Sequence, residues 1–232
     1  MSNKSKYFKL NKISKKLDKL IFKNFIGWSG LHLSKINIPQ KQVLNEQIFD
    51  KIFPKLKKRE KIFFSDEGKA LLTINNTKSK FKKFDILNIF ENVKYSFKAE
   101  KNTNIFMIAN RQKKKSLMKK KFVISNFKKD IKPVNLWGGK IISRPYEGHN
   151  MTLVYFQLKN GFSFHDNGHS NEQITWLNKG KMFFYVNKAK KTLTKNVGVS
   201  IGSKIKHGGF SKGANGFDAF HPKRKEKKYL NK

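Results

Sequence analysis

Short apolar runs, separated by turn signals, restrict this chain to a mainly β fold. The first set lies at residues 61–64, 70–74, 84–90, 93–97 and 105–109. Asp66-Glu67-Gly68 and Asn75-Asn76 fall between these runs, and clusters of this kind mark tight turns. Several strand-sized runs at this spacing are typical of a small closed barrel. We therefore predict a barrel of the oligonucleotide-binding (OB) type at residues 60–125.

A second set of apolar runs follows a loop-rich link that contains Pro133, Gly138 and Gly139. It begins near Ile141 and includes residues 151–158, 174–177 and 181–186. Residues 178–180, Asn-Lys-Gly, predict a turn that joins the last two runs as a strand pair. No apolar run approaches the roughly 20 residues that span a bilayer. The pattern predicts a second small β core.

The charge balance indicates a polyanionic partner. The chain has 52 Lys and Arg against 15 Asp and Glu, a formal net charge of +37. Self-repulsion on this scale opposes compaction, and nucleic acid or an anionic membrane would relieve it. The charge is spread along the whole chain, which favours nucleic acid over a membrane-docking patch. Nearly all of it is Lys, which neutralises phosphate, whereas Arg makes the bidentate contacts that read guanine.

The two ends of the chain are interpreted as basic extensions. Residues 1–59 form an N-terminal extension and connector, in which Leu10, Ile13, Leu17 and Leu20 recur at helical spacing. A second short helix is expected within residues 40–52, between two prolines. The Gly-rich and basic residues 187–232 are expected to be mostly extended and ordered by what they bind. Frequent Lys, Asn, Phe and Ile indicate an A/T-rich coding sequence, of the kind common in organelle genomes.

The candidate chemical residues give little support to an enzyme. His165 and His169 bracket Asp166 in a His-x-x-x-His spacing, but Asn167-Gly168 breaks a helix there and no third ligand is apparent. We interpret this stretch as a polar loop and predict no metal and no cofactor. The chain has no cysteine, which excludes disulfides and thiolate nucleophiles. No paired carboxylates or Ser/His/Asp set is recognisable by spacing, so the sequence predicts that the protein is not an enzyme. The other residues considered for catalysis are Arg144, His149, His207 and His221.

The Gly-rich tract at residues 202–216 lacks the Gly-Lys-Ser/Thr ending of a phosphate-binding loop. Its glycines are interpreted instead as positions where the backbone approaches a nucleic-acid phosphate closely. Phe210, Phe217 and Phe220 are the aromatic residues expected to contact RNA. The predicted RNA-binding residues are Lys78, Lys80, Lys82, Lys83, Arg111, Lys113, Lys114, Lys115, Lys119, Lys120, Lys121, Arg144, Lys204, Lys206, His207, Lys212, Lys223, Arg224 and Lys225.

Several short elements resemble, in the same order, those of the universal large-subunit ribosomal protein L-two family. They are residues 100–108, Asp130-Ile131-Lys132, residues 149–153, Asn160-Gly161 with Gly168, and residues 179–186, 197–202 and 207–213. The resemblance covers roughly residues 62–221 and rests on the order of these elements. The family's Gly-Gly-Gly-His-Lys loop is not matched at residues 75–80, and its terminal His/Gly-rich extension has no clear counterpart.

The resemblance implies an OB-type barrel at residues 60–125, an SH3-like barrel at residues 126–196 and an RNA-binding tail at residues 197–232. It implies a structural constituent of the mitochondrial large ribosomal subunit that binds ribosomal RNA near the peptidyl-transferase region. Expected partners are that RNA, neighbouring ribosomal proteins and a separate chain supplying the terminal extension. The alternatives are a non-ribosomal organellar RNA- or DNA-binding protein and, with least support, an enzyme acting on RNA.

Overall fold

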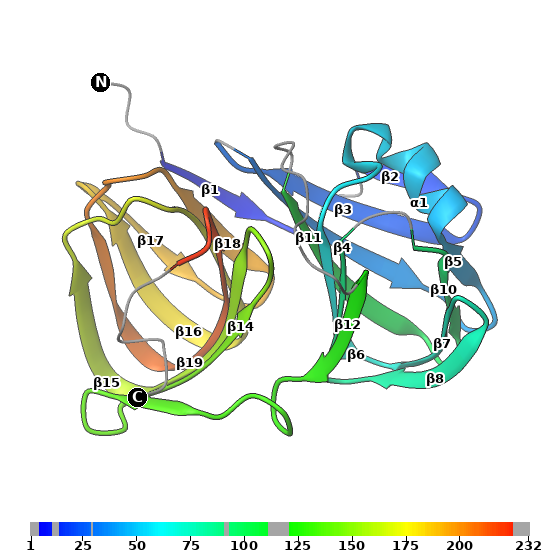
Figure 1. Ribbon diagram of the computed structural model, residues 1–232. Helices are drawn as coiled ribbons and strands as arrows, with labels where there is room; N and C mark the ends of the chain where they lie inside the picture. The colour runs from blue at the N-terminus through cyan, green and yellow to red at the C-terminus, as the bar shows by residue number, and fades with distance from the viewer. Residues whose placement is uncertain (1–4, 11–13, 29, 91–92, 111–120, 225–232) are drawn as a thin grey trace. The chain divides into compact units, whose positions relative to one another are not determined.

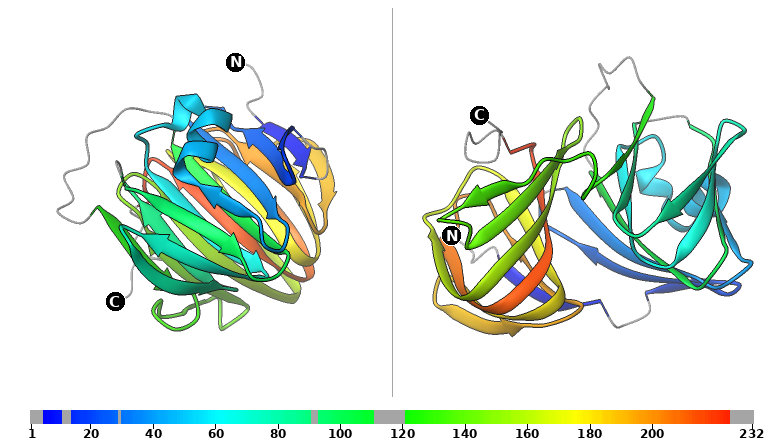
Figure 2. Two further views of the ribbon diagram at one scale, coloured as in Figure 1. Left: turned by 90° about the vertical axis from the view of Figure 1, so that its right-hand side faces the viewer. Right: turned by 90° about the horizontal axis from the view of Figure 1, so that it is seen from below.

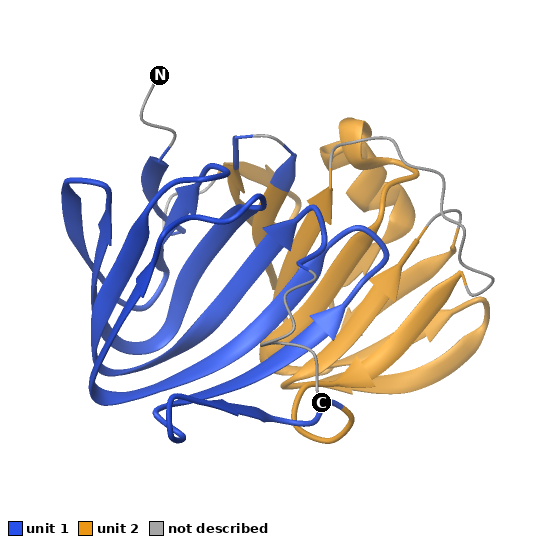
Figure 3. Ribbon diagram, turned by 60° about the vertical axis from the view of Figure 1, so that its left-hand side comes forward, with its two compact units in different colours: residues 1–10, 27–31, 131–232 blue, residues 11–26, 32–130 orange. Residues whose placement is uncertain are grey.

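A computed structural model of the chain describes residues 5–10, 14–28, 30–90, 93–110 and 121–224, and they fold mainly into antiparallel β-strands. The chain divides into two compact units (Figure 3). Unit 1 contains residues 1–10, 27–31 and 131–232, and unit 2 contains residues 11–26 and 32–130. No helix among the described residues is long and apolar enough to cross a membrane.

Unit 2 is built from a seven-stranded sheet, in the order β12-β9-β6-β11-β4-β3-β2, and a four-stranded sheet, in the order β5-β10-β7-β8. Its strands are β2 (Lys15–Leu17), β3 (Leu20–Ile26), β4 (Leu31–Ile38), β5 (Val43–Asn45), β6 (Lys61–Glu67), β7 (Lys69–Ile74), β8 (Thr77–Lys82), β9 (Asp85–Ile89), β10 (Tyr95–Ala99), β11 (Thr103–Asn110) and β12 (Phe122–Asn126). The helix expected within residues 40–52 is present as α1 (Glu46–Ile52), followed by the 3-10 turn η1 (Pro54–Leu56). The side chain of Asn45 caps α1 by accepting a hydrogen bond from the amide of Ile48.

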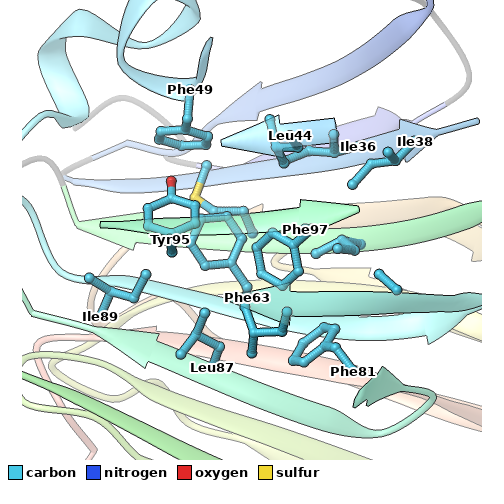
Figure 4. Packing of buried hydrophobic residues seen from close by; sticks show 14 of the residues in the cluster. Ile36, Ile38, Leu44, Phe49, Phe63, Phe81, Leu87, Ile89, Tyr95 and Phe97 are labelled. Atoms are coloured by element: carbon cyan, nitrogen blue, oxygen red, sulfur yellow. The ribbon is translucent and has the colours of Figure 1, made fainter. Parts of the chain in front are cut away.

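Aromatic rings fill the interior of unit 2 (Figure 4). Phe63 of β6 packs against Tyr95 and Phe97 of β10, with ring centroids 5.3 and 5.5 Å apart. Phe49 of α1 contacts Phe63 at 5.7 Å, and Phe81 of β8 contacts Phe97 at 5.1 Å. Because side chains occupy this space at the density of a core, the interior of unit 2 stabilises the fold.

Unit 1 contains an eight-stranded sheet in the order β1-β18-β16-β19-β15-β14-β13, with β17 paired to β16 (Figure 1). Its strands are β1 (Ser5–Lys9), β13 (Val134–Leu136), β14 (Ile141–Glu147), β15 (Thr152–Asp166), β16 (Glu172–Val186), β17 (Ala189–Leu193), β18 (Val197–Ile201) and β19 (His207–His221). The strand β19 lies between β15 and β16 and pairs with both along its length. The N-terminal strand β1 pairs with β18, so the two ends of the chain contribute to one sheet.

The long strands β15, β16 and β19 curve strongly (Figures 1 and 2). Gly161, Gly180 and Gly213 have positive φ angles of 78°, 84° and 78°. The β15–β19 register shifts between Asn160 and Ser163, and the β16–β19 register shifts on both sides of Gly180. Such bulges bend a strand, and glycine adopts the required backbone conformation without strain. Residues 178–180, expected to form a turn between two strands, therefore lie within one continuous bent strand.

The predicted OB-type and SH3-like barrels with basic extensions are wrong. Residues 207–221, expected to be an extended tail, form the central strand of unit 1. The glycines of this tract permit close strand packing, because a Cβ on Gly216 would overlap the carbonyl oxygen of Trp176. The expected N-terminal helix is replaced by strands, and Leu17 and Leu20 face each other across a tight turn. A pair of residues flanking such a turn produces the same i, i+3 spacing as a helix.

Candidate metal-binding site

The sheet of unit 1 encloses a cavity of about 90 Å³ with an apolar and a polar part. The apolar part is lined by Leu136, Trp137, Ile141, Val154, Phe156, Leu158, Phe164, Met182 and Phe184. The polar part is lined by Ser143, His165, Asp166, Gln173, Thr175, His207, Asp218 and Arg224. These polar residues come from four strands and the adjoining loops, so only the folded sheet brings them together.

Asp166, His169 and His207 gather at this cavity with their ligand atoms all within 4.8 Å of one another. Asp166 ends β15 and His207 begins β19, and the antiparallel register places the two residues opposite each other. His169 lies in the loop between β15 and β16. The backbone carbonyl of His169 accepts a hydrogen bond from the amide of Lys204 at 2.6 Å. Both histidines are buried, and Asp166 is half-buried.

Hydrogen bonds orient both imidazole rings. The Nδ1 of His207 lies 2.9 Å from the carbonyl oxygen of Ile205, which can only accept, so Nδ1 donates and Nε2 carries the lone pair. The Nε2 of His169 lies 2.9 Å from Oε1 of Gln173 and donates to it. The amide orientation of Gln173 is consistent, since its Nε2 donates to Thr175 and Asp218. Fixing the second ring nitrogen in this way is how proteins present histidines to metals.

The charges of the cluster suit a cation. Burial acts to raise the pKa of Asp166, but the Gly168 amide at 2.8 Å and the nearby His207, His169 and Arg224 lower it overall. Asp166 is therefore a carboxylate. Burial lowers the pKa of His207, which favours the neutral imidazole. A deprotonated carboxylate and a neutral imidazole are the forms that bind metal.

Arg224 forms an ion pair with the carboxylate of Asp166. Its Nη2 lies 3.4 Å from Oδ2 of Asp166, and the side chains of Arg224 and Asp166 are 3% and 20% exposed, so the pair is partly shielded from water. The guanidinium lies 4.6 Å from the ring centroid of Phe220, and the backbone amide donates to Thr152 at 3.0 Å. These contacts fix Arg224 and, through it, the orientation of Asp166.

Further polar groups line the cavity beside the cluster. The carboxylate oxygen of Asp218 accepts from Thr175 at 2.6 Å and from Gln173 at 3.1 Å. Burial raises the pKa of Asp218 to about 6, against the opposing effect of these two donors. The hydroxyl of Ser143 is buried and has no hydrogen-bond partner among the described residues. Ser143 and Asp218 are therefore placed to bind a polar group of a ligand in the cavity.

Two imidazoles and one carboxylate form a donor set that suits borderline divalent metals such as Zn²⁺, Fe²⁺, Mn²⁺ or Co²⁺. Three protein ligands leave coordination positions for water or a ligand. The donor types and their separation, together with the carboxylate form of Asp166 and the neutral form of His207, fit such an ion.

The sequence pattern had paired the wrong residues. His165, one position before Asp166, makes contacts outside the cluster at 2.7 Å to the hydroxyl of Tyr185 and at 2.8 Å to Asn167. His165 also lines the polar part of the cavity, but these two contacts engage both of its ring nitrogens, and it is not part of the cluster. The third ligand, His207, comes from a distant strand, so a search for ligands near His169 could not find it. Arg144, His149 and His221 lie outside the cluster.

The predicted RNA-binding residues do not form one surface. Exposed positions include Lys78, Lys80, Lys82, Lys83 and Lys121 in unit 2 and Lys204, Lys206 and Lys212 in unit 1. Arg144 is half-buried on β14, Lys223 forms an ion pair with Glu147, and His207 and Arg224 are buried at the cavity. Of the three tail phenylalanines, Phe217 and Phe220 are core residues and Phe210 is exposed. Arg111, Lys113, Lys114, Lys115, Lys119, Lys120 and Lys225 lie outside the described residues.

No protein-family model matches the chain, and no curated protein matches it. The structure is similar to AerE from Microcystis aeruginosa, with a TM-score of 0.75 and 13% identity over 93% of this chain and 98% of that one. It is similar to a cupin 2 conserved barrel domain protein from Leptotrichia buccalis, with a TM-score of 0.63 and 15% identity over 93% and 94% of the two chains. It is also similar to oxalate decarboxylase from Lactobacillus farciminis, solved as a formate complex, with a TM-score of 0.72 and 9% identity over 93% and 86%. The fold is therefore the cupin-type jelly roll.

This fold overturns the ribosomal interpretation. The chain is not similar in structure to the ribosomal L-two family, and nothing supports ribosomal RNA, ribosomal proteins or a separate extension chain as partners. The alternative of an organellar RNA- or DNA-binding protein is not supported either. The prediction that the protein is not an enzyme is also contradicted, since the fold is shared with decarboxylases and the tertiary structure assembles a candidate metal site. The mitochondrial location stays a prediction.

Proposed function

We propose that unit 1 binds a divalent transition metal ion through Asp166, His169 and His207 and acts on a small molecule in the adjoining cavity. The observation that carries this proposal is the gathering of one carboxylate and two imidazoles, within 4.8 Å, at a cavity with further polar groups. A bound ion would supply Lewis-acid polarisation of a coordinated ligand oxygen. The similarity to cupin-type proteins, oxalate decarboxylase among them, supports a small-molecule or enzymatic role.

The residues around the cluster have separable roles in this proposal. Arg224 and the Gly168 amide hold Asp166 as a carboxylate, and Ile205 and Gln173 orient the two histidines. Ser143 and Asp218 bind the polar end of the ligand, while the apolar wall excludes water. The cavity of about 90 Å³ compares with about 30 Å³ per molecule in liquid water, so the ligand has few heavy atoms. A small carboxylic acid is of this size.

An enzymatic role is favoured over simple binding by the position of Asp218. It is half-buried, lines the cavity, and has a pKa raised to about 6 by desolvation, so it exchanges a proton near neutral pH. A carboxyl group tuned in this way is suited to general acid or base catalysis. The second candidate is a binding protein that takes up the metal and ligand without turnover.

Metal binding tests the first part of the proposal. The full-length protein is stripped with EDTA and titrated calorimetrically with Mn²⁺, Co²⁺, Ni²⁺ and Zn²⁺, and with Fe²⁺ in the absence of oxygen. We expect one ion per chain, and a His207→Ala variant should bind it at least about tenfold more weakly, since a ligand is lost. His149→Ala is the matched control, because His149 lies in the loop between β14 and β15, outside the cluster. Equal affinity of the folded His207→Ala variant and the wild type would rule out this site.

Turnover is tested separately on the metal-loaded protein. A panel of small carboxylic acids, oxalate included, is incubated with it and followed by NMR. An enzyme should convert at least one acid, and Asp218→Asn should lower kcat while the metal affinity stays unchanged. Metal-dependent ligand binding without conversion of any acid would instead identify a binding protein.

A further inference from the structure

A second hollow of unit 1 contains none of the three clustered residues Asp166, His169 and His207, although Phe164, His165 and Phe184 line both hollows. It is a groove of about 750 Å³ on the face of the sheet that Phe183 and Phe210 share, lined by β15, β16, β17 and β19. Met182 and Phe184 are buried, whereas the intervening Phe183 is 41% exposed, so Phe183 lies on the opposite face of β16. The volume falls within the range of roughly 300–1,000 Å³ that is usual for small-molecule pockets.

The floor of the groove is a hydrogen-bonded pair of rings. The register places Tyr185 of β16 and His165 of β15 on either side of Gly208 in β19. The hydroxyl of Tyr185 lies 2.7 Å from Nδ1 of His165, and the two rings are inclined by only 21°. A Cβ on Gly208 would overlap the Tyr185 hydroxyl, so glycine is required for the two rings to meet over β19. The result is a flat, π-rich surface.

The adjacent wall consists of two exposed phenyl rings. Phe183 and Phe210 face each other across β16 and β19, 41% and 37% exposed, with centroids 6.4 Å apart and planes inclined by 24°. The ammonium groups of Lys181 and Lys212 lie 5.2 and 5.9 Å from the centre of the Phe183 ring. Cations at these distances interact favourably with the ring face. The wall therefore combines aromatic surface with positive charge.

The remaining side of the groove is cationic. Lys190 of β17 lines it and is paired in register with Tyr185, whereas the ammonium of the next residue, Lys191, lies 5.4 Å from the ring centre of Tyr7. None of the described residues that line the groove is acidic. Positive potential beside flat aromatic surfaces is complementary to a molecule that carries a negative group on a planar ring.

We propose that this groove binds a planar aromatic anion. Its ring lies against Phe183, Phe210 and Tyr185, and its anionic group lies beside Lys190. Ring contacts supply the affinity that a surface of lysines alone lacks, and the lysines select an anion over a neutral ring.

The probe is 1-naphthyl phosphate, titrated into the full-length protein by fluorescence and calorimetry, with 1-naphthol and inorganic phosphate as separate half-molecules. We expect the intact probe to bind at least tenfold more tightly than either half. The double variant Phe183→Ala/Phe210→Ala should weaken binding of the probe about tenfold, as expected for the loss of aromatic contacts. Both side chains are exposed, so circular dichroism should show an unchanged fold.

The anion contact is tested with a matched pair of single variants. Lys190→Gln should lower the affinity for the phosphate probe and flatten its salt dependence, while 1-naphthol binding stays unchanged. Lys179→Gln removes the same charge from an exposed position outside the groove and should leave probe binding unchanged. Equal effects of the two variants would overturn the proposal. Binding that disappears when EDTA removes metal would also overturn it, by placing the probe at the metal cluster.

Discussion

Replacing Asp218 by asparagine should stabilise unit 1 at neutral pH. Asp218 is half-buried at the cavity, and desolvation there raises its pKa from 3.8 to about 6. The shift is about 2 units, and each unit corresponds to about 1.4 kcal/mol, so ionised Asp218 destabilises the folded state by about 3 kcal/mol at pH 7. The asparagine side chain retains an oxygen that accepts the hydrogen bonds from Thr175 and Gln173. The variant therefore loses the charge and keeps these contacts.

The sign of the pH dependence follows from the raised pKa. Between about pH 4 and pH 6 the folded state binds more protons at Asp218 than the unfolded state does. The stability contributed by protonated Asp218 is fully present below pH 4 and is lost as the pH rises through 6. The free energy of unfolding of Asp218→Asn relative to wild type should accordingly rise by about 3 kcal/mol between pH 4 and pH 7.

Guanidinium unfolding of the metal-free protein, followed by tryptophan fluorescence, measures this difference. Trp28, Trp137 and Trp176 are the three tryptophans of the chain, and all belong to unit 1, so the signal reports that unit. Glu147→Gln controls for the loss of one negative charge, since Glu147 is an exposed carboxylate of the same unit. A difference between Asp218→Asn and wild type that stays constant from pH 4 to pH 7 would refute the reasoning.

Three further predictions concern stability. Gly216→Ala should lower the free energy of unfolding of unit 1 by more than about 2 kcal/mol, because the added Cβ would overlap the Trp176 carbonyl. Gly161→Ala should lower it by only about 1 kcal/mol, because the space around Gly161 is open and only its φ of 78° opposes a side chain. Comparing the denaturant midpoints of the two variants tests this difference. Deleting residues 1–10 should lower the midpoint of the tryptophan-detected transition, because β1 then no longer covers β18; an unchanged midpoint would show that β1 is dispensable. Lys61→Met should raise the melting temperature of unit 2 at pH 7, because burial lowers the pKa of Lys61 to about 8 and so opposes its charged form. This gain in melting temperature should fade above pH 8, where Lys61 loses its proton in the folded state. Calorimetry at pH 7 and pH 10 measures the gain, and a gain that is independent of pH would contradict the prediction.

The mainly β character of the chain could be predicted from sequence, because strand-sized apolar runs report it locally. Residues 70–74 were predicted to form a strand, and the structure places them in β7, where every second residue is buried. The kind of barrel could not be predicted in this way. Asn178-Lys179-Gly180 has the composition of a turn, yet Gly180 occupies a bulge within β16, and both environments select glycine at positive φ. Because a turn was predicted at this position, the long strand β16 was interpreted as two short strands, and two short strands are typical of a smaller barrel.

The charge of the chain was a poor guide to function. The excess of Lys over acid predicted a polyanionic partner, but a surface rich in Lys is compatible with a fold whose interior carries the functional groups. Arg224 shows this directly, since it was expected to contact RNA and is buried against Asp166. Net charge determines solubility and nonspecific attraction, and it does not determine the fold.

The sequence by itself determined the strand content, the glycines at which strands bend or pack closely, and the identities of the side chains that can bind metal. The tertiary structure alone decided which of those side chains meet. His207 reaches Asp166 because β19 pairs with β15 in one particular register, and the loop after β15 returns His169 to the same place. The local pattern of a strand fixes which residues share a face, but pairing between strands distant in sequence depends on the packing of the whole sheet. For that reason the candidate metal ligands, unlike the strands that carry them, could be identified only in the folded chain.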